Sequence, residues 1–315
     1  MEIIRSLKHF ESLTSSVLTI GSYDGIHRGH HEILSAVVNH AHARSVPSVL
    51  VTFDPHPRHI LDPNADKLSL IMSMDQKMGI VESLGIDLVY VINFTEAFSK
   101  TTAQDFLDQS VVPFFNPKYL IIGYDHHFGN QREGSPQFLD EYCMHQSIGL
   151  EIIQPVSDDG HSISSSRIRQ LIQDGFVRRA NFELGSVFGF IATVIHGAGR
   201  GKELNFPTAN VVPVEKNQLM PKPGVYFTRG RIIGLQAYGM CNFGTRPTFE
   251  EDELVLEVHL FNDYSENLYD HIVWIEFLER IRNEVKFSSV NKLTEQLLKD
   301  KKKCLVLKEK YELGG

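Results

Sequence analysis

The chain has 315 residues, a mass of 35.8 kDa and a formal net charge of −8. This length predicts two domains, and a composition of 42% hydrophobic and 22% charged residues is typical of a globular protein. From the sequence we expect no membrane helix and no secretory signal, because no stretch approaches the length of an apolar span and residues 1–10 contain no apolar run. Three scattered cysteines exclude a disulfide framework or a Cys-rich zinc site. We expect a cytoplasmic protein, and the acidic charge argues against nucleic acid as a partner.

The first part of the chain alternates strand-like runs with helical patterns. Strands are predicted at residues 17–20, 48–53, 88–92, 119–122 and 151–154. Helices are predicted at residues 30–44, 74–84, 103–111 and 135–147. This alternation predicts right-handed βαβ units and a parallel sheet, and ligands bind beyond the carboxyl ends of such strands. We therefore expect an α/β, doubly wound, Rossmann-like domain over residues 1–185.

The second part, residues 186–315, has a different pattern. Short alternating segments separated by Gly and Pro turns predict antiparallel strands at residues 188–195, 224–228, 231–238, 254–260 and 271–278. Helices are predicted at residues 289–303 and 305–313, with the lysine run at 299–303 as a solvated helix end. We expect an antiparallel β-barrel or sandwich with closing helices.

The segment after the first predicted sheet strand, GSYDGIHRGH (21–30), is rich in candidate functional residues. His27 and His30 span the predicted start of a helix, where free N–H groups and the helix dipole attract phosphate. Gly29 would allow a nucleotide to approach closely. The alternative is that the two histidines only cap the helix. Gly21 and Asp24 complete the candidate loop.

Further candidates follow the other strands, and we expect all of them at one edge of the sheet: Asp54, His56, Asp125, Ser164, Ser165, Ser166 and Arg167. Serine hydroxyls at a helix start can bind polyphosphate, and an arginine can bind it in a bidentate manner. The alternative is a simple serine N-cap. Together with His-x-Gly-His, the Ser-Arg segment predicts a nucleotidyltransferase that transfers the α-phosphate of ATP and releases pyrophosphate.

The second domain carries a different set of polar residues. Thr208 and Asn210 offer hard oxygen ligands suited to Mg²⁺ with bound phosphates, although a loop with an Asx turn is the alternative. Glu257 alternates with apolar residues on a predicted strand, so it could deprotonate an alcohol or simply be exposed. His259 shares its face. The histidine pairs at 56/59 and 126/127 and the glycine-rich segment 197–202 do not match zinc or P-loop patterns.

The whole chain resembles the bacterial bifunctional riboflavin kinase/FAD synthetases. The matching segments run in the order of that family: GSYDGIHRGHHEIL (21–34), FDPHP (53–57), IIGYDHHFG (121–129), ISSSRIRQLI (163–172), NFPTANVVP (205–213), PKPGVY (221–226), NFGTRPTF (242–249), LEVHLF (256–261), NLYD (267–270) and IEFLERIRNEVKF (275–287). Each segment alone is weak evidence for the resemblance, whereas the complete set in this order is specific for the family.

The resemblance implies two ATP-dependent reactions that need Mg²⁺. The barrel would phosphorylate riboflavin to FMN, and the first domain would adenylylate FMN to FAD with release of pyrophosphate. His27 and His30 would contact the phosphates of ATP, and Ser166 and Arg167 would close on them. In the kinase domain, Thr208 and Asn210 would hold Mg-ATP, Glu257 would act as general base on the riboflavin 5′-hydroxyl, and Arg246 would close over the site.

The chain departs from the family pattern at several positions. Asn205 stands where the family has Gly before Phe-Pro-Thr, and Asp270 stands where it has a turn Gly. His126 and His127 replace the usual Phe-Arg, which removes a permanent positive charge. We nevertheless expect both activities. The alternatives are an adenylyltransferase for pantetheine phosphate or nicotinamide mononucleotide, and a flavin- or nucleotide-binding regulator without turnover.

Overall fold

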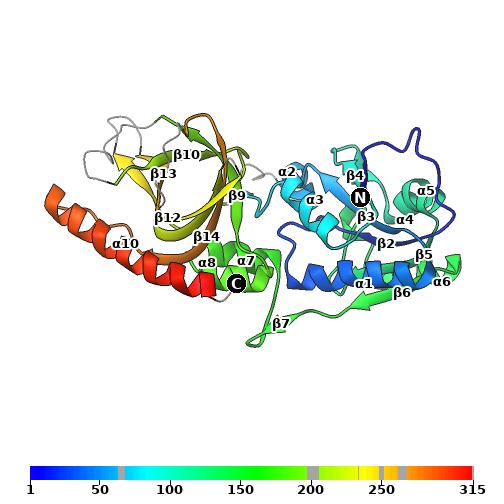
Figure 1. Ribbon diagram of the computed structural model, residues 1–315. Coiled ribbons are helices and arrows are strands. Elements are labelled where there is room, and N and C mark those ends of the chain that lie inside the picture. Colours follow the sequence, from blue (N-terminus) through cyan, green and yellow to red (C-terminus); the bar gives the residue numbers. More distant parts are fainter. Residues whose placement is uncertain (63–67, 197–205, 233, 248–251, 262–267, 314–315) are drawn as a thin grey trace. The chain divides into compact units, whose positions relative to one another are not determined.

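The computed structural model describes residues 1–62, 68–196, 206–232, 234–247, 252–261 and 268–313 (Figure 1). The chain forms two compact units, Met1–Ser165 and Ser166–Gly315, and each is described by itself. Among the described residues, no helix is long and apolar enough to cross a membrane.

The first unit contains a six-stranded sheet in the order β1-β4-β3-β2-β5-β6, and all its strand pairs are parallel. The strands are β1 (Glu2–Ile4), β2 (Ser16–Ile20), β3 (Ser48–Asp54), β4 (Leu88–Asn93), β5 (Pro117–Gly123) and β6 (Gly149–Ile153). The parallel α/β fold predicted from the sequence is confirmed. Because β3, β2, β5 and β6 are parallel neighbours, the segments that follow them begin at the same edge of the sheet.

Helices cover both faces of this sheet. Buried side chains of α1 (Arg28–Arg44) and α3 (Met74–Ser83) belong to one core, and those of α4 (Ala103–Phe106), α5 (Val112–Phe115) and α6 (Pro136–Gln146) belong to another. The helix predicted at 103–111 differs from the structure, because a π-helical turn at Leu107–Val111 joins α4 to α5. The short helix α2 (Pro57–Leu61) and the hairpin of β7 (Ser157–Asp158) and β8 (His161–Ser162) were not predicted.

The second unit is a closed barrel in the order β10-β13-β12-β11-β14-β9, which confirms the antiparallel barrel expected from the sequence. Its strands are β9 (Gly189–Ile195), β10 (Ala209–Pro213), β11 (Gly224–Ile232), β12 (Leu235–Pro247), β13 (Asp252–Leu260) and β14 (Ile272–Arg282). A single long helix, α10 (Val290–Leu313), lies against the barrel (Figure 1). Its buried Cys304 belongs to a core cluster with Phe227 and Leu278 of the barrel. The prediction of two closing helices is therefore wrong, and the lysine run lies within one helix.

Helices α7 (Ser165–Gln173) and α8 (Val177–Leu184) belong to the second unit, except for Ser165, the first residue of α7. The predicted first domain ended at residue 185, whereas the compact units divide at Ser165 and Ser166. The reason is that α8 packs on β14: the Asn181 amide donates to the carbonyl of Phe277 at 2.9 Å. A compact unit and a catalytic domain need not end at the same residue, so the boundary at 185 stays a prediction.

Candidate active sites

The first candidate site lies where β2 ends and α1 begins. His27 is the N-cap of α1, and its Nδ1 accepts a hydrogen bond from the backbone N–H of His30 at 3.3 Å. The two imidazole rings stack with centroids 3.6 Å apart and planes 16° from parallel. The structure thus brings these two predicted residues together at a helix N-terminus. His27 is therefore a helix cap, which was the structural alternative, and phosphate binding at this helix start stays a prediction.

Burial sets the charge of both histidines. Burial, with the nearby charge of His31, lowers the pKa of His27 to about 4. Burial, with the charges of His27 and Lys77, holds the pKa of His30 well below its ordinary value of 6.5. Both rings are therefore neutral at pH 7. A neutral imidazole can donate one N–H to a phosphate oxygen, but it supplies no positive charge.

Two glycines in this loop leave room for neighbouring aromatic rings. A Cβ added at Gly29 would lie 3.3 Å from the ring of His27, and one added at Gly21 would lie 2.6 Å from the ring of Tyr23. The Tyr23 hydroxyl in turn lies 2.6 Å from the Thr19 hydroxyl. Gly29, which the sequence suggested for the close approach of a nucleotide, therefore also leaves room for the ring of His27.

Asp24 connects the loop to the serine run. Its side chain is buried, and the carboxylate accepts a hydrogen bond from the backbone N–H of Ile71 at 3.1 Å. Its backbone carbonyl accepts a hydrogen bond from the Ser165 hydroxyl at 2.7 Å. Ser164 and Ser165 are half-buried and Ser166 is exposed. The predicted meeting of the first and last post-strand segments thus holds for Asp24 and Ser165.

The remaining candidates of the first unit lie at the ends of β3 and β5. Asp54 is the last residue of β3, and Arg5 Nη1 donates to its carboxylate at 3.0 Å. His56 caps α2, with Nδ1 accepting from the backbone N–H of Arg58 at 3.2 Å. Asp125 is exposed in the turn after β5. His56 thus has a local structural role, whereas Asp54 and Asp125 stand at the expected sheet edge.

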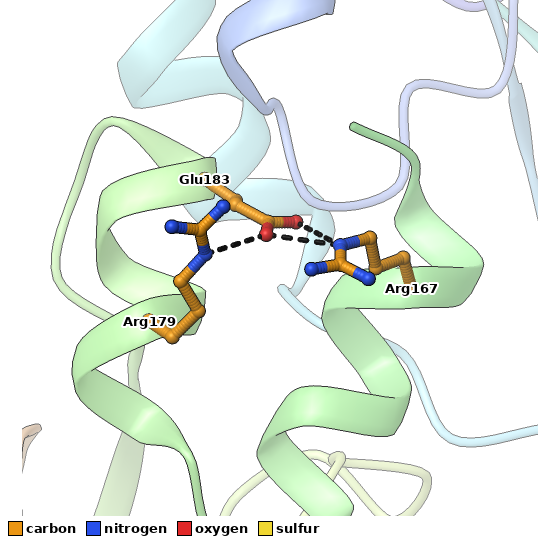
Figure 2. A network of polar contacts seen from close by, with 3 residues as sticks. All are labelled: Arg167, Arg179 and Glu183. Atoms are coloured by element: carbon orange, nitrogen blue, oxygen red, sulfur yellow. Dashed lines mark hydrogen bonds and ion pairs between the residues drawn. The ribbon is translucent and has the colours of Figure 1, made fainter. Parts of the chain in front are cut away.

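Arg167 belongs to a buried ion cluster that the sequence analysis missed (Figure 2). Its Nε lies 3.0 and 3.1 Å from the two carboxylate oxygens of Glu183, and the Nε of Arg179 lies 2.9 Å from one of them. The Glu183 side chain is fully buried. One signal was available: Glu183 interrupts the buried stripe of α8 formed by Val177, Ala180 and Leu184. A carboxylate among buried apolar positions indicates a charged partner.

The second candidate site lies on the barrel. In the antiparallel ladders, Glu257 of β13 is directly opposite Asn210 of β10 on one side and Asn242 of β12 on the other. Residues directly opposite in a ladder project to the same face, so the three polar side chains form a row across three strands. Asn210 is buried and Thr208 stands just before β10. Asn242 was missed, because sequence alone does not give the register of β12.

His259 shares the face of Glu257 and contacts the loop before β10. Its Nδ1 lies 2.8 Å from the carbonyl oxygen of Pro207, next to Thr208. Burial lowers its pKa, so the ring is neutral at pH 7 and its Nδ1–H donates to that carbonyl. His259 therefore stabilises the loop that carries Thr208, and the assignment of the base to Glu257 stays a prediction.

Other sequence predictions fall at the margin of the described chain. The backbone of Arg246 pairs with Glu253 in the β12–β13 ladder, and its side chain lies outside the described residues. Asn205 and the glycine-rich segment 197–202 also lie outside them. Asp270 has φ of 63°, so this turn does take the left-handed conformation that favours glycine.

A parallel α/β domain with a His-x-Gly-His helix start, followed by a closed six-stranded barrel, defines a two-domain protein of the nucleotidyltransferase and kinase class. The family model described as FAD synthetase matches residues 9–167, and the model described as riboflavin kinase matches residues 184–307. The chain belongs to the bifunctional riboflavin kinase/FMN adenylyltransferase family.

Relatives of that name match almost the full length. The protein of Bacillus subtilis is 32% identical over 94% of this chain and 93% of its own length. The protein of Escherichia coli K12 is 32% identical over 95% of this chain and 96% of its own. A crystal structure from Streptococcus pneumoniae, titled a macrolide-efflux protein, superposes with a TM-score of 0.87, 32% identity and coverage of 95% of this chain and 97% of that chain.

Proposed function

We propose that this protein makes FAD from riboflavin in two ATP-dependent steps. In the first, riboflavin and ATP give FMN and ADP; in the second, FMN and a second ATP give FAD and pyrophosphate. The observation that carries the proposal is that both family models match one chain in succession. We also propose that the catalytic domains are residues 1–185 and 186–315 and that the protein acts in the cytoplasm.

In the adenylyltransferase domain, an oxygen of the FMN phosphate attacks the α-phosphorus of ATP, and the bond to pyrophosphate breaks in line. The helix N-terminus at His27 and His30 offers backbone and imidazole N–H groups to the phosphates, where negative charge builds in the transition state. Arg167, whose Nε is already held by Glu183, would close on the same phosphates together with Ser166. Gly21, Asp24 and Ser165 would shape the binding loop.

In the kinase domain, the 5′-hydroxyl of riboflavin attacks the γ-phosphorus of ATP and ADP leaves. Glu257 accepts the hydroxyl proton as the new bond forms. Its position mid-strand, opposite Asn210, holds the carboxylate on a rigid element. We propose that Arg246 closes over this site.

Both reactions are proposed to use Mg²⁺. The donors at the barrel site fit this ion, because the Thr208 hydroxyl and the Asn210 amide are hard oxygen ligands beside the Glu257 carboxylate. Bound there, the ion would neutralise phosphate charge. Thr208 and Asn210 would hold it together with the phosphates of ATP.

Two single substitutions test whether the sites are separate. His30→Ala should nearly abolish FMN adenylylation while riboflavin phosphorylation continues, so riboflavin with Mg-ATP should accumulate FMN. Glu257→Gln should lower kinase turnover by roughly 10²–10⁴-fold while adenylylation of added FMN continues. Chromatography of the flavins measures both. Equal loss of both activities in a folded variant would contradict the two-site proposal.

A further inference from the structure

Lys77 is a buried cation next to the His27–His30 loop. It lies on the inward face of α3, with Met78 and Val81, and the residue is only 5% exposed. A lysine is rarely buried unless its ammonium has partners, because removing the charge from water is costly. The burial of this charged side chain therefore needs a chemical explanation, and the sequence pattern of α3 alone does not provide one.

The ammonium of Lys77 contacts the loop that belongs to the proposed adenylyltransferase site. Lys77 Nζ donates a hydrogen bond to the carbonyl oxygen of Ser22 at 2.5 Å, and Ser22 belongs to the GSYDGIHRGH loop. This is its one hydrogen bond among the residues that the structure describes, although an ammonium carries three donors. Two N–H groups therefore remain for a ligand.

Charged neighbours place the ammonium among the candidate residues. Asp24, in the same loop, and Asp54, at the end of β3, favour its protonated form. In turn, its charge disfavours protonation of His30 on α1. Lys77 thus lies within electrostatic reach of three predicted site residues from two segments, the GSYDGIHRGH loop and the end of β3. Arg5 is paired with one of them, Asp54.

A site for ATP phosphates requires positive charge, and the two histidines do not provide it because burial keeps them neutral. Lys77 is protonated at pH 7, since burial lowers its pKa only to about 8. Lys77 can therefore supply the positive charge toward the phosphates that the two histidines do not supply.

We propose that Lys77 is a phosphate-binding residue of the FMN adenylyltransferase site, whose ammonium keeps the Ser22 carbonyl as one partner and donates its other N–H groups to ATP phosphate oxygens. This inference rests on the proposed function. It gives α3 a part in catalysis, because the helix carries the cation to the edge of the sheet where His27 and His30 lie.

The kinetic test uses FMN and Mg-ATP without riboflavin, so that the kinase domain is idle. Lys77→Met should lower kcat/KM for ATP by about 10–100-fold, the usual effect of losing a charged hydrogen bond. The KM for FMN and the riboflavin kinase activity of the same variant should change little. Lys77→Arg should retain most of the activity. The matched control is Lys118→Met, an exposed lysine of the same unit, which should behave as the wild type.

The pH dependence of kcat/KM for ATP distinguishes a Lys77 charge that binds phosphate from a Lys77 side chain that has only a packing role. Since the pKa of Lys77 is about 8, kcat/KM for ATP in the wild type should fall as pH rises from 7 to 9.5. The phosphate of FMN is mostly in its doubly ionised form throughout that range, since its second pKa is about 6. In Lys77→Arg the decline should disappear, because a guanidinium stays protonated.

Three results would overturn the proposal: unchanged ATP kinetics in Lys77→Met, equal increases of KM for ATP and FMN, or a wild-type profile that is flat between pH 7 and 9.5. A wild type that forms no FAD would contradict the proposed function instead. In that case, titration calorimetry with inorganic pyrophosphate still decides: Lys77→Met should weaken its binding about 10–100-fold, and equal affinity of the two proteins would refute the assignment.

Discussion

The buried cluster of Glu183, Arg167 and Arg179 gives a quantitative prediction about stability. The Glu183 carboxylate is fully buried and receives both guanidinium Nε atoms at 2.9–3.1 Å. Removing one arginine leaves the carboxylate paired with the other. Removing both leaves an uncompensated buried charge, a change that typically costs about 3–5 kcal/mol.

We therefore expect the two losses to be non-additive. Arg167→Met and Arg179→Met should each lower the free energy of unfolding by about 1 kcal/mol, near the value of one hydrogen bond. The double variant should lose about 3–5 kcal/mol, which is more than the sum. Adding Glu183→Leu to the double variant should restore most of this loss, because an apolar side chain needs no partner in a buried site.

The chain offers a local probe for this measurement. Its single tryptophan, Trp274, lies on β14, the strand on which α8 packs. Urea unfolding followed by tryptophan fluorescence therefore reports on the unit that contains Glu183. Comparison is valid where the dependence of unfolding on urea keeps the same slope in all variants. Additive losses, or a triple variant as unstable as the double, would show that Glu183 does not depend on these arginines for its charge.

Two further predictions concern the barrel and a third concerns both reactions. His259→Gln should raise the KM of the kinase for ATP, because His259 holds the carbonyl next to Thr208, but should leave turnover within about tenfold; a greater loss than in Glu257→Gln would transfer the base to His259. Asp270→Gly should raise the free energy of unfolding by about 1 kcal/mol, since φ is 63°, and destabilisation would contradict this. Chelation of Mg²⁺ should stop both reactions, measured by flavin chromatography, and activity that persists in chelator would contradict the ion's role.

The sequence predicted the parallel sheet well because its central strands are continuous apolar runs. Residues 17–20, 48–53 and 119–122 are short runs rich in apolar and β-branched residues, a pattern typical of buried parallel strands. In contrast, β1 and β10 were missed, because a strand of 3 residues and one of 5 ending in proline give almost no periodic signal. The break expected in α10 was also wrong: Cys304 is buried in the core shared with the barrel, and the lysines before it, at 301–303, are good helix formers.

The candidate sites were predictable where they depend on local chain. His27 and His30 are three residues apart at a helix start, so their proximity follows from helix geometry. Lys77 and the pair of Glu183 with Arg167 were not predictable in the same way, because each contact joins two different elements, whereas Arg179 lies four residues before Glu183 on α8. A lysine or glutamate in a helix is normally taken as exposed, and the packing of α3 and α8 shows that these two are buried.

The most direct test of the central proposal is a product time course with the purified full chain, riboflavin and Mg-ATP. The proposal predicts that FMN appears first and that FAD and pyrophosphate then form at its expense, with two ATP consumed per FAD. FMN that accumulates without conversion to FAD, or riboflavin that remains unchanged, would contradict a bifunctional enzyme.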